Sequence, residues 1–311
     1  MTQSASLLSV SAASIDFQNP VILAAGTAAY GRELAGVMNL DAVGGIVTKA
    51  VSPEPRNGAP APRVAEFDGG MMNAVGLANP GLEAVIRDDL PWLVRNIKKA
   101  RIIVNVVGST VDDFEIVTRS LANADGVDAF ELNVSCPNTR AGGTEFGADR
   151  NTLTSLVSKC RAVTKRPLFV KLSPMLPDIG DTAKAAVDAG ADGLTLVNTI
   201  PGLAIDIESK RPALGFGSGG ISGIGLLPVG VLAVWKVSRV VKVPLIGVGG
   251  ITRGADVIQY LLAGASLVGL GTAALRDPKA PERIIRELMS WCRSHNVISI
   301  TDLTGKLEWP S

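Results

Sequence analysis

Short runs of β-branched residues alternate with amphipathic helical patterns along the whole chain, and this alternation limits the possible folds most strongly. A regular alternation of this kind predicts strand–helix–strand units that build a parallel sheet. Eight runs have the length and composition of strands. They are PVILAAG from Pro20, GGIVTKA from Gly44, RIIVNVVG from Arg101, VDAFELNVS from Val127, PLFVKLS from Pro167, DGLTLVN from Asp192, VPLIGVGG from Val243 and SLVGLGT from Ser266.

Helical patterns separate these runs, and several strands carry apolar residues on both faces. The helices are expected at 81–99, 111–123, 151–164, 178–189, 225–241, 253–263 and 279–294. Apolar residues on both faces are typical of strands covered by helices on one side and by a barrel core on the other. An open doubly wound sheet uses the same units, but eight of them with Gly-rich turns after the last two strands favour an α/β (TIM) barrel. Such barrels typically have about 250 residues or more, so residues 1–311 are expected to form a single domain.

Two connections are longer than a barrel requires. Residues 51–80 and 199–224 are rich in Gly, Pro and Asn, and they contain the alternating segments RVAEF and LAIDIES. Long ordered loops in a compact domain are usually functional. We therefore expect small extra strands that lie over the C-terminal face of the barrel.

Composition excludes several classes of protein. The chain has 30 basic and 29 acidic residues without a long run of either sign, which disfavours a nucleic-acid binder. No apolar stretch reaches about 18 residues, and the start of the chain lacks the basic and apolar regions of a signal peptide, so no membrane contact and a cytoplasmic location are expected. Three scattered cysteines do not predict a disulfide framework or a zinc site. The single histidine, His295, lies in the last predicted helix, where a solvated role is expected, so proton chemistry must use another residue.

Polar residues end six of the eight predicted strands, and the active site of an α/β barrel forms at these C-terminal ends. Gly249-Gly250 and Gly271-Thr272 follow the last two strands, where backbone N–H groups can approach a phosphate closely. Glycine is also common in any tight turn, so this pattern alone has two interpretations. The amides of Asn105, Asn133 and Asn198 offer both donors and acceptors, which suits a cyclic imide.

Two lysines and one cysteine carry the candidate chemistry. Lys49 and Lys171 end strands, and each has two functional interpretations: Schiff-base chemistry, or a fixed positive charge beside an anionic cofactor such as reduced flavin. Cys136 lies in NVSCPNTRAGGTEFG, where it is either a small filler or a base, because nearby lysines favour a thiolate and the glycines suit a flap over substrate. Cys160 and Cys292 lie in predicted helices, where we expect structural roles.

Four motifs together resemble one enzyme family. NVSCPNT, the NAVGLANPG run from Asn73, VNT at Val197 and ITRGADV after VGVGG are similar to the motifs of class 1 dihydroorotate dehydrogenases. The similarity extends from about Ile15 to Glu308, and the stretch GMMNAVGLANPGLEAV looks more like class 1B, a catalytic subunit that works with an electron-transfer subunit.

The resemblance implies a flavoenzyme that oxidises (S)-dihydroorotate to orotate in de novo pyrimidine (UMP) biosynthesis. Cys136 would remove the C5 proton while hydride passes from C6 to N5 of FMN. Lys171 would stabilise the negative charge of the reduced flavin, and Lys49 would lie between flavin and substrate, helping to hold the carboxylate.

The same resemblance assigns binding residues, and no metal. The substrate would contact Lys49, Asn73, Ala74, Val75, Gly76, Leu77, Asn133, Asn138, Asn198 and Thr199. FMN would contact Ala25, Gly26, Lys49, Ala50, Asn105, Asn133, Lys171, Val197, Gly223, Gly249, Gly250, Gly271 and Thr272. Two departures from the family pattern stand out: Ala25 replaces a usual serine near the flavin, and GISGIGLLP differs from the usual sequence around Gly223.

The sequence has no dinucleotide fingerprint and no iron–sulfur cysteine cluster, so electrons must leave through a partner or a diffusible acceptor. The class 1B resemblance implies a partner with FAD and an iron–sulfur cluster that reduces NAD+, in a homodimer or a heterotetramer with that subunit; fumarate is the other acceptor considered. Three alternatives stay open at this point. They are a dihydropyrimidine dehydrogenase-like flavoenzyme acting on uracil or thymine, a Schiff-base lyase using Lys171, and a non-catalytic phosphate-binding barrel.

Overall fold

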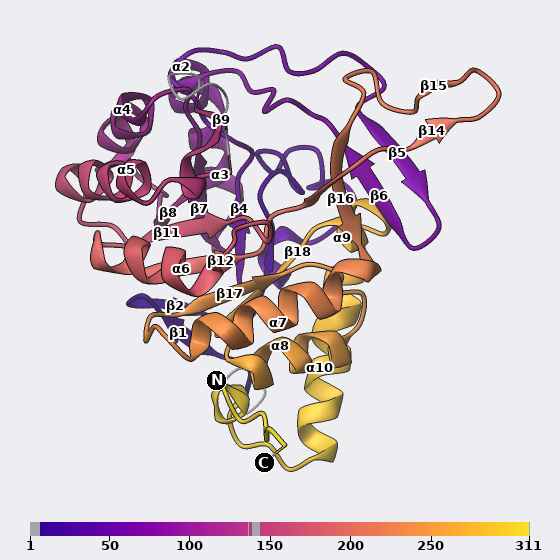
Figure 1. The fold of residues 1–311 in the computed structure, drawn as a ribbon. Coiled ribbons are helices and arrows are strands. Elements are labelled where there is room, and N and C mark those ends of the chain that lie inside the picture. Colours follow the sequence, from indigo (N-terminus) through magenta and orange to yellow (C-terminus); the bar gives the residue numbers. More distant parts are fainter. Residues whose placement is uncertain (1–6, 136, 139–143, 311) are drawn as a thin grey trace.

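Eight parallel strands close into a barrel in the computed structural model, which describes residues 7–135, 137–138 and 144–310 (Figure 1). The strands follow one another around the barrel in chain order, and the last pairs with the first to close it. The barrel strands are β3 (Val21–Leu23), β4 (Gly45–Val47), β7 (Arg101–Val106), β8 (Ala129–Asn133), β11 (Leu168–Leu172), β12 (Gly193–Leu196), β17 (Leu245–Val248) and β18 (Leu267–Leu270). The predicted TIM barrel and all eight of its strands are confirmed.

Helices cover the outside of the barrel at each of the seven positions that the sequence predicts. They are α2 (Leu82–Ala84), the π-helical turn η2 (Val85–Asp89), α3 (Leu90–Asn96), α4 (Val111–Leu121), α5 (Arg150–Val163), α6 (Ile179–Asp188), α7 (Leu227–Ser238), α8 (Gly254–Ala263) and α10 (Ala280–Ser294). The segment expected as one helix at 81–99 is divided into α2, η2 and α3, and the short α9 (Thr272–Arg276) was not expected. Short 3-10 turns lie at η1 (Leu40–Ala42), η4 (Phe146–Ala148), η5 (Ile224–Leu226) and η6 (Ile300–Leu303).

The core lies on both sides of the barrel wall. Every residue of β11 and β18 is buried, as a strand between a barrel interior and a helical layer requires. Phe130 and Phe169 are completely buried. The helices turn apolar faces to this wall, so the long apolar strand runs of the sequence become the centre of the fold.

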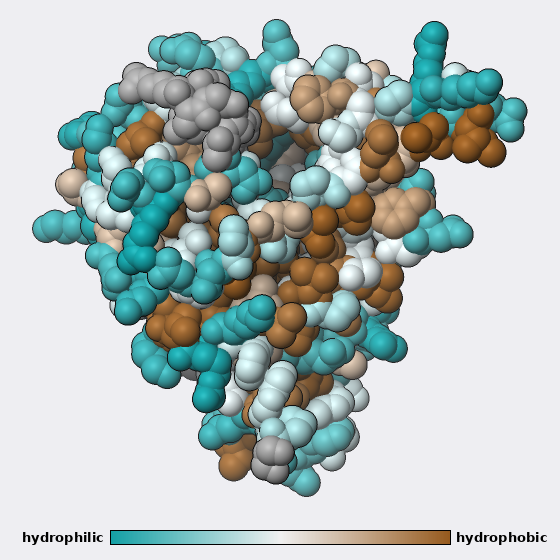
Figure 2. All heavy atoms as spheres, in the orientation of Figure 1, coloured by the Kyte–Doolittle hydropathy of each residue, from teal (hydrophilic) through white to brown (hydrophobic). Residues whose placement is uncertain are grey.

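The two long connections form a second, four-stranded antiparallel sheet. It consists of β5 (Val64–Phe67), β6 (Gly70–Asn73), β13 (Ile200–Gly202) and β16 (Gly219–Gly223), in the order β13-β16-β6-β5. The expected RVAEF strand is therefore present as β5. LAIDIES forms only β14 (Ile205–Asp206), which pairs with β15 (Arg211–Pro212) in a hairpin that projects from the body (Figure 1). Ile205 and Ile207 of this hairpin are exposed, and Figure 2 shows apolar side chains gathered there.

Two small hairpins complete the described structure. The first pairs β1 (Val10–Ala12) with β2 (Ile15–Phe17), lies at the end of the barrel away from the four-stranded sheet, and buries Phe17 (Figure 1). The sequence does not predict this hairpin, because three-residue strands give little periodicity. The second pairs β9 (Pro137–Asn138) with β10 (Thr144–Glu145). Within the described residues, no helix has the length and apolar character needed to span a membrane.

Candidate functional site

A cavity of about 730 Å³ lies at the C-terminal ends of the barrel strands, and the four-stranded sheet forms its outer wall. Met71 and Asn73 of β6 and Ser222 and Gly223 of β16 line this wall. Figure 2 shows the hollow in the upper part of the molecule. Because the pairing of β16 with β6 joins the two long connections, both connections shape one site.

The barrel brings nearly all of the predicted site residues into this cavity. Those that line it are Ala25, Gly26, Lys49, Ala50, Asn73, Ala74, Val75, Gly76, Leu77, Asn105, Asn133, Lys171, Val197, Asn198, Thr199, Gly223, Gly249, Gly250, Gly271 and Thr272. Cys136 lies outside the described residues. Asn138 belongs to β9, and its side chain is likewise outside the description.

Two ammonium groups face the cavity. Lys171 is on β11 between Asn133 of β8 and Thr195 of β12, and the residue is only 7% exposed. Lys49 follows β4 and is half-buried. Within the described part of the chain, neither ammonium forms a hydrogen bond or an ion pair. An unpaired buried charge is unfavourable unless a ligand compensates it, so this geometry is suited to an anionic or electron-rich ligand.

Three asparagine amides approach the same region with weak contacts to the protein. The Asn198 Nδ2 donates to Asn133 Oδ1 at 3.5 Å, and Asn73 Nδ2 donates to the Gly220 carbonyl at 3.4 Å. The Thr199 N–H donates to Asn198 Oδ1 at 2.9 Å, which fixes how that amide is turned. These long bonds leave donors and acceptors for a ligand whose edge alternates carbonyl and N–H groups.

A buried carboxylate that sequence analysis missed orients the fourth amide. Glu131 on β8 is 1% exposed and accepts hydrogen bonds from Asn105 Nδ2 at 2.7 Å and from Thr195 Oγ1 at 2.8 Å. Since the Asn105 amino group is committed to Glu131, its carbonyl oxygen remains as an acceptor at the cavity wall. The signal in the sequence was a single Glu inside the otherwise apolar strand VDAFELNVS.

Glycines line the side of the cavity that is formed by the turns after β17 and β18, across from Lys49 and Asn105. Gly249 and Gly250 follow β17 with φ of +129° and +72°, values that L-residues with a side chain rarely adopt. A Cβ on Gly250 would lie 2.4 Å from the Leu227 nitrogen at the start of α7. Within the described part of the chain, the Gly250 N–H has no acceptor. On the neighbouring strand, Thr272 Oγ1 donates to Ser222 Oγ at 2.8 Å and so ties the turn after β18 to the outer sheet.

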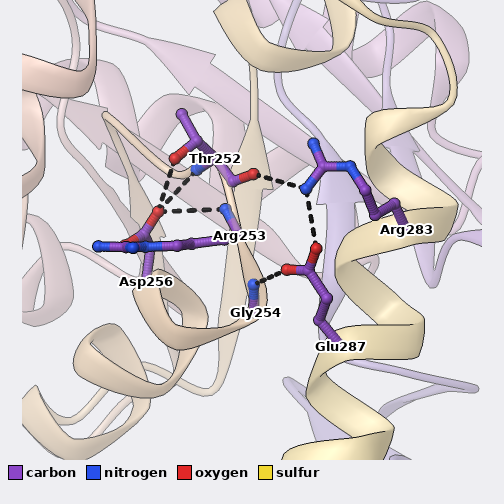
Figure 3. Close-up of polar contacts among 6 residues, drawn as sticks. All are labelled: Thr252, Arg253, Gly254, Asp256, Arg283 and Glu287. Atoms are coloured by element: carbon purple, nitrogen blue, oxygen red, sulfur yellow. Dashed lines mark hydrogen bonds and ion pairs between the residues drawn. The ribbon is translucent and has the colours of Figure 1, made fainter.

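A buried aspartate holds the turn that follows Gly250. Asp256, in the first turn of α8, is 1% exposed. Its Oδ2 accepts from the Thr252 N–H at 2.9 Å, the Thr252 hydroxyl at 3.0 Å and the Arg253 N–H at 3.1 Å (Figure 3). Three donors on one carboxylate oxygen fix this turn against its helix.

Helix α10 holds the same turn from the other side (Figure 3). Glu287 Oε2 accepts from the Gly254 N–H at 2.7 Å, and Arg283 donates to the Thr252 carbonyl at 3.2 Å. Arg283 also pairs with Glu287 at 2.9 Å. The sequence pattern of α10 indicates only an amphipathic helix, because these contacts depend on how it packs against α8.

The remaining cysteines and the histidine lie outside the cavity. Cys160 and Cys292 are buried in α5 and α10. Burial raises the pKa of the Cys160 thiol to about 12 and also raises the pKa of the Cys292 thiol, so both stay neutral. His295 is exposed and stacks on Trp291 at the end of α10, as expected for a solvated residue. None of these groups takes part in the candidate site.

Comparison with known proteins agrees with this arrangement. The family model for dihydroorotate dehydrogenase matches residues 7–291. A protein of Pelobacter propionicus named dihydroorotate dehydrogenase B (NAD(+)), catalytic subunit, is 44% identical over 97% of this chain and 98% of its own length. A protein of Geobacter sp. strain M21 with the same name is 43% identical over the same shares.

A solved structure gives the same result for the fold. The structure of DHODH in complex with ferulenol from Eimeria tenella superposes with a TM-score of 0.80 at 25% identity, covering 96% of this chain and 88% of the other. The family model, the similar sequences and the similar structure therefore all indicate the same family. The chain belongs to the dihydroorotate dehydrogenase family.

Proposed function

We propose that this protein, acting as one FMN-binding unit over residues 1–311, oxidises dihydroorotate to orotate in pyrimidine biosynthesis. The observation that carries the proposal is the polarity of the cavity. One side presents three weakly bonded amides and two ammonium groups, and the other presents the glycine turn with the Gly250 N–H; neither the ammonium groups nor this N–H has a partner among the described residues. That arrangement suits an anionic imide beside a cofactor with a phosphate.

The described residues fit FMN. The N–H of Gly250, which has no acceptor among the described residues, and the glycine turns after β17 and β18 would hold its phosphate. At Gly250 only glycine allows the backbone so close to the start of α7. The Asn105 carbonyl oxygen and Lys171 would face its ring system. Ala25 has no hydroxyl where the family pattern has serine, so its backbone N–H would serve there. Bound FMN supplies a two-electron acceptor for hydride.

The residues on the lysine side would bind and activate the substrate. Lys49 would neutralise the carboxylate, while Asn73, Asn133 and Asn198 would bond the alternating edge of the ring. The Cys136 thiolate would take the proton from C5 and become a thiol. Hydride would leave C6 in the same conversion, and the C5–C6 bond would become the double bond of orotate.

Electrons must then leave the protein. The curated relatives are named catalytic subunits of NAD(+)-dependent enzymes. We infer that this chain also works with a partner subunit, which carries FAD and an iron–sulfur cluster and reduces NAD+. Co-purification of such a subunit from the native host would support this assembly, while turnover of the isolated chain with fumarate would contradict it.

Substitution Cys136→Ser tests the proposed base. Flavin should remain bound, while anaerobic reduction by dihydroorotate should slow by orders of magnitude near neutral pH, because a hydroxyl is a far weaker base than a thiolate. Stopped-flow absorbance of the flavin measures this rate.

Cys292→Ser is the matched control, since it makes the same chemical change on α10, away from the cavity, and should leave the reduction rate of folded protein unchanged. Unchanged reduction in Cys136→Ser would refute the base assignment. Orotate should perturb the flavin spectrum of wild-type protein more strongly than uracil, because uracil has no carboxylate for Lys49.

A further inference from the structure

A buried tyrosine outside the cavity contacts its glycine wall. Tyr260 lies on α8 and is completely buried. Its hydroxyl donates a hydrogen bond of 2.8 Å to the carbonyl of Gly249, the first residue after β17 and part of the cavity lining. The side chain therefore reaches from the helical layer to the peptide at the edge of the site.

Two other glycines make the space that this side chain occupies. A Cβ on Gly230 of α7 would lie 1.9 Å from the Tyr260 hydroxyl oxygen. A Cβ on Gly247 of β17 would lie 2.2 Å from the Tyr260 ring. Packing alone thus fixes the ring, and a phenylalanine would fill the same space. What the hydroxyl adds is its hydrogen bond to the Gly249 carbonyl, which also compensates for its burial.

The geometry of the peptide bond shows what this hydrogen bond controls. Within the described residues, the Gly249–Gly250 bond is not among the cis peptides, and a trans peptide directs its C=O and N–H to opposite sides. When the Gly249 carbonyl points to Tyr260 in the helical layer, the Gly250 N–H points away from that layer. Both residues are glycines with positive φ, so no side chain holds this peptide plane in place.

We propose that Tyr260 is a positioning residue that keeps the Gly250 N–H turned toward the cavity, where it donates to the phosphate of FMN. This inference rests on the proposed FMN site. Burial, and then the charge of Asp256, raises the pKa of Tyr260 far above its usual range, so the hydroxyl stays protonated and remains a donor at working pH.

The variant Tyr260→Phe in the full chain tests the inference. Flavin is removed from the purified protein, and FMN and riboflavin are titrated separately while quenching of flavin fluorescence is recorded. The Kd for FMN should rise about tenfold, the effect of one hydrogen bond to a charged group, while the Kd for riboflavin, which has no phosphate, stays within about twofold. The 31P resonance of bound FMN should also shift.

Tyr30→Phe is the matched control. The Tyr30 hydroxyl is buried and donates at 2.8 Å to the carbonyl of Ala50, another cavity residue, after β4. Its removal makes the same chemical change away from Gly250, so the ratio of the two affinities should not move. Equal weakening of both ligands in Tyr260→Phe, or no change in either, would overturn the inference.

A measurement on wild-type protein makes the test independent of how the variant folds. With 15N-glycine labelling, the amide proton of Gly250 should move downfield on addition of FMN and stay in place on addition of riboflavin. A Gly250 amide that responds equally to both would also overturn the inference. If wild-type protein binds FMN no better than riboflavin, the phosphate site of the proposed function itself fails, and the inference fails with it.

Discussion

The two ends of the barrel differ in whether their polar groups have hydrogen-bond partners within the protein. At the N-terminal end, carboxylates bind N–H groups near the start of the strands: Asp128 accepts from Ile102 at 2.8 Å, and Asp192 accepts from Leu168 at 2.8 Å. Arg166 donates there to the carbonyls of Ala122, Ala124 and Val127. Backbone N–H groups and carbonyls thus compensate the charges of the two carboxylates and of the Arg166 guanidinium. The same contacts join successive strand–helix units.

At the C-terminal end, some of the polar groups that face the cavity lack such partners among the described residues. The ammonium groups of Lys49 and Lys171 and the N–H of Gly250 have no partner within the described ranges. A buried polar group without a hydrogen-bond partner lowers stability. A fold keeps such a group where a bound ligand supplies the partner. The difference teaches that one end of the barrel stabilises the fold, whereas the other is preorganised for binding and chemistry.

The largest effect that this comparison predicts concerns Lys171. The variant Lys171→Met should slow flavin reduction by dihydroorotate about a thousandfold, because one preorganised charge at a reacting centre contributes that much. Its free energy of unfolding should not fall, since among the described residues the ammonium has no partner to lose. Stopped-flow reduction and urea unfolding of the same preparation measure both quantities.

Lys184→Met, on the exposed side of α6, is the control and should alter neither quantity. A Lys171→Met protein that is strongly destabilised would show that the C-terminal end is held together in the same way as the N-terminal end, and the comparison would fail.

The opposite pattern is expected for Arg166. Arg166→Ala removes the donors to three carbonyls between α4 and β8, and should lower the free energy of unfolding by about 3 kcal/mol. Reduction of the flavin in the folded fraction should stay within about twofold of wild type, because no preorganised group at the reacting centre is removed. Urea unfolding with the neighbouring exposed Lys165→Ala as control measures the effect. A change of rate without loss of stability would contradict it.

The sequence was sufficient to predict the barrel strands, because each has a clear local pattern. Each apolar run became a strand, and closure of the barrel then brought Lys49, Asn105 and Lys171 together, because all three lie at C-terminal strand ends. Position in the element was enough to place them in one cavity.

What could not be predicted depends on contacts between distant segments. The pairing of Ser222 with Met71 builds the outer sheet, and the bond from Tyr260 to Gly249 depends on how α8 packs. Neither leaves a periodic signal in the sequence. The role of Cys136 came from resemblance to a family and is still a prediction, because the residue lies outside the described part of the chain.

The smallest predicted effect concerns Asp41 at the N-terminal end. Burial pushes the pKa of this carboxyl up, but hydrogen bonds from the backbone N–H groups of Lys99, Ala100 and Lys98 outweigh burial and hold its pKa below the usual range. A carboxyl with a depressed folded pKa contributes stability above its unfolded pKa, near 3.9, and that contribution is lost as pH falls through the folded value.

Asp41→Asn keeps an oxygen that can accept from these N–H groups but loses the charge, so the free energy of unfolding should fall by only about 1 kcal/mol at pH 7. The difference between wild type and variant should shrink as pH falls below about 3.9, because Asp41 of the wild type then becomes protonated in the folded state as well. Urea unfolding across this pH range measures the difference, and the exposed Asp125→Asn should show none at any pH. A difference that grows toward low pH would mean that burial, rather than the three N–H groups, dominates at Asp41. The N-terminal end would then contain an unfavourable charge of the kind that the comparison assigns only to the cavity.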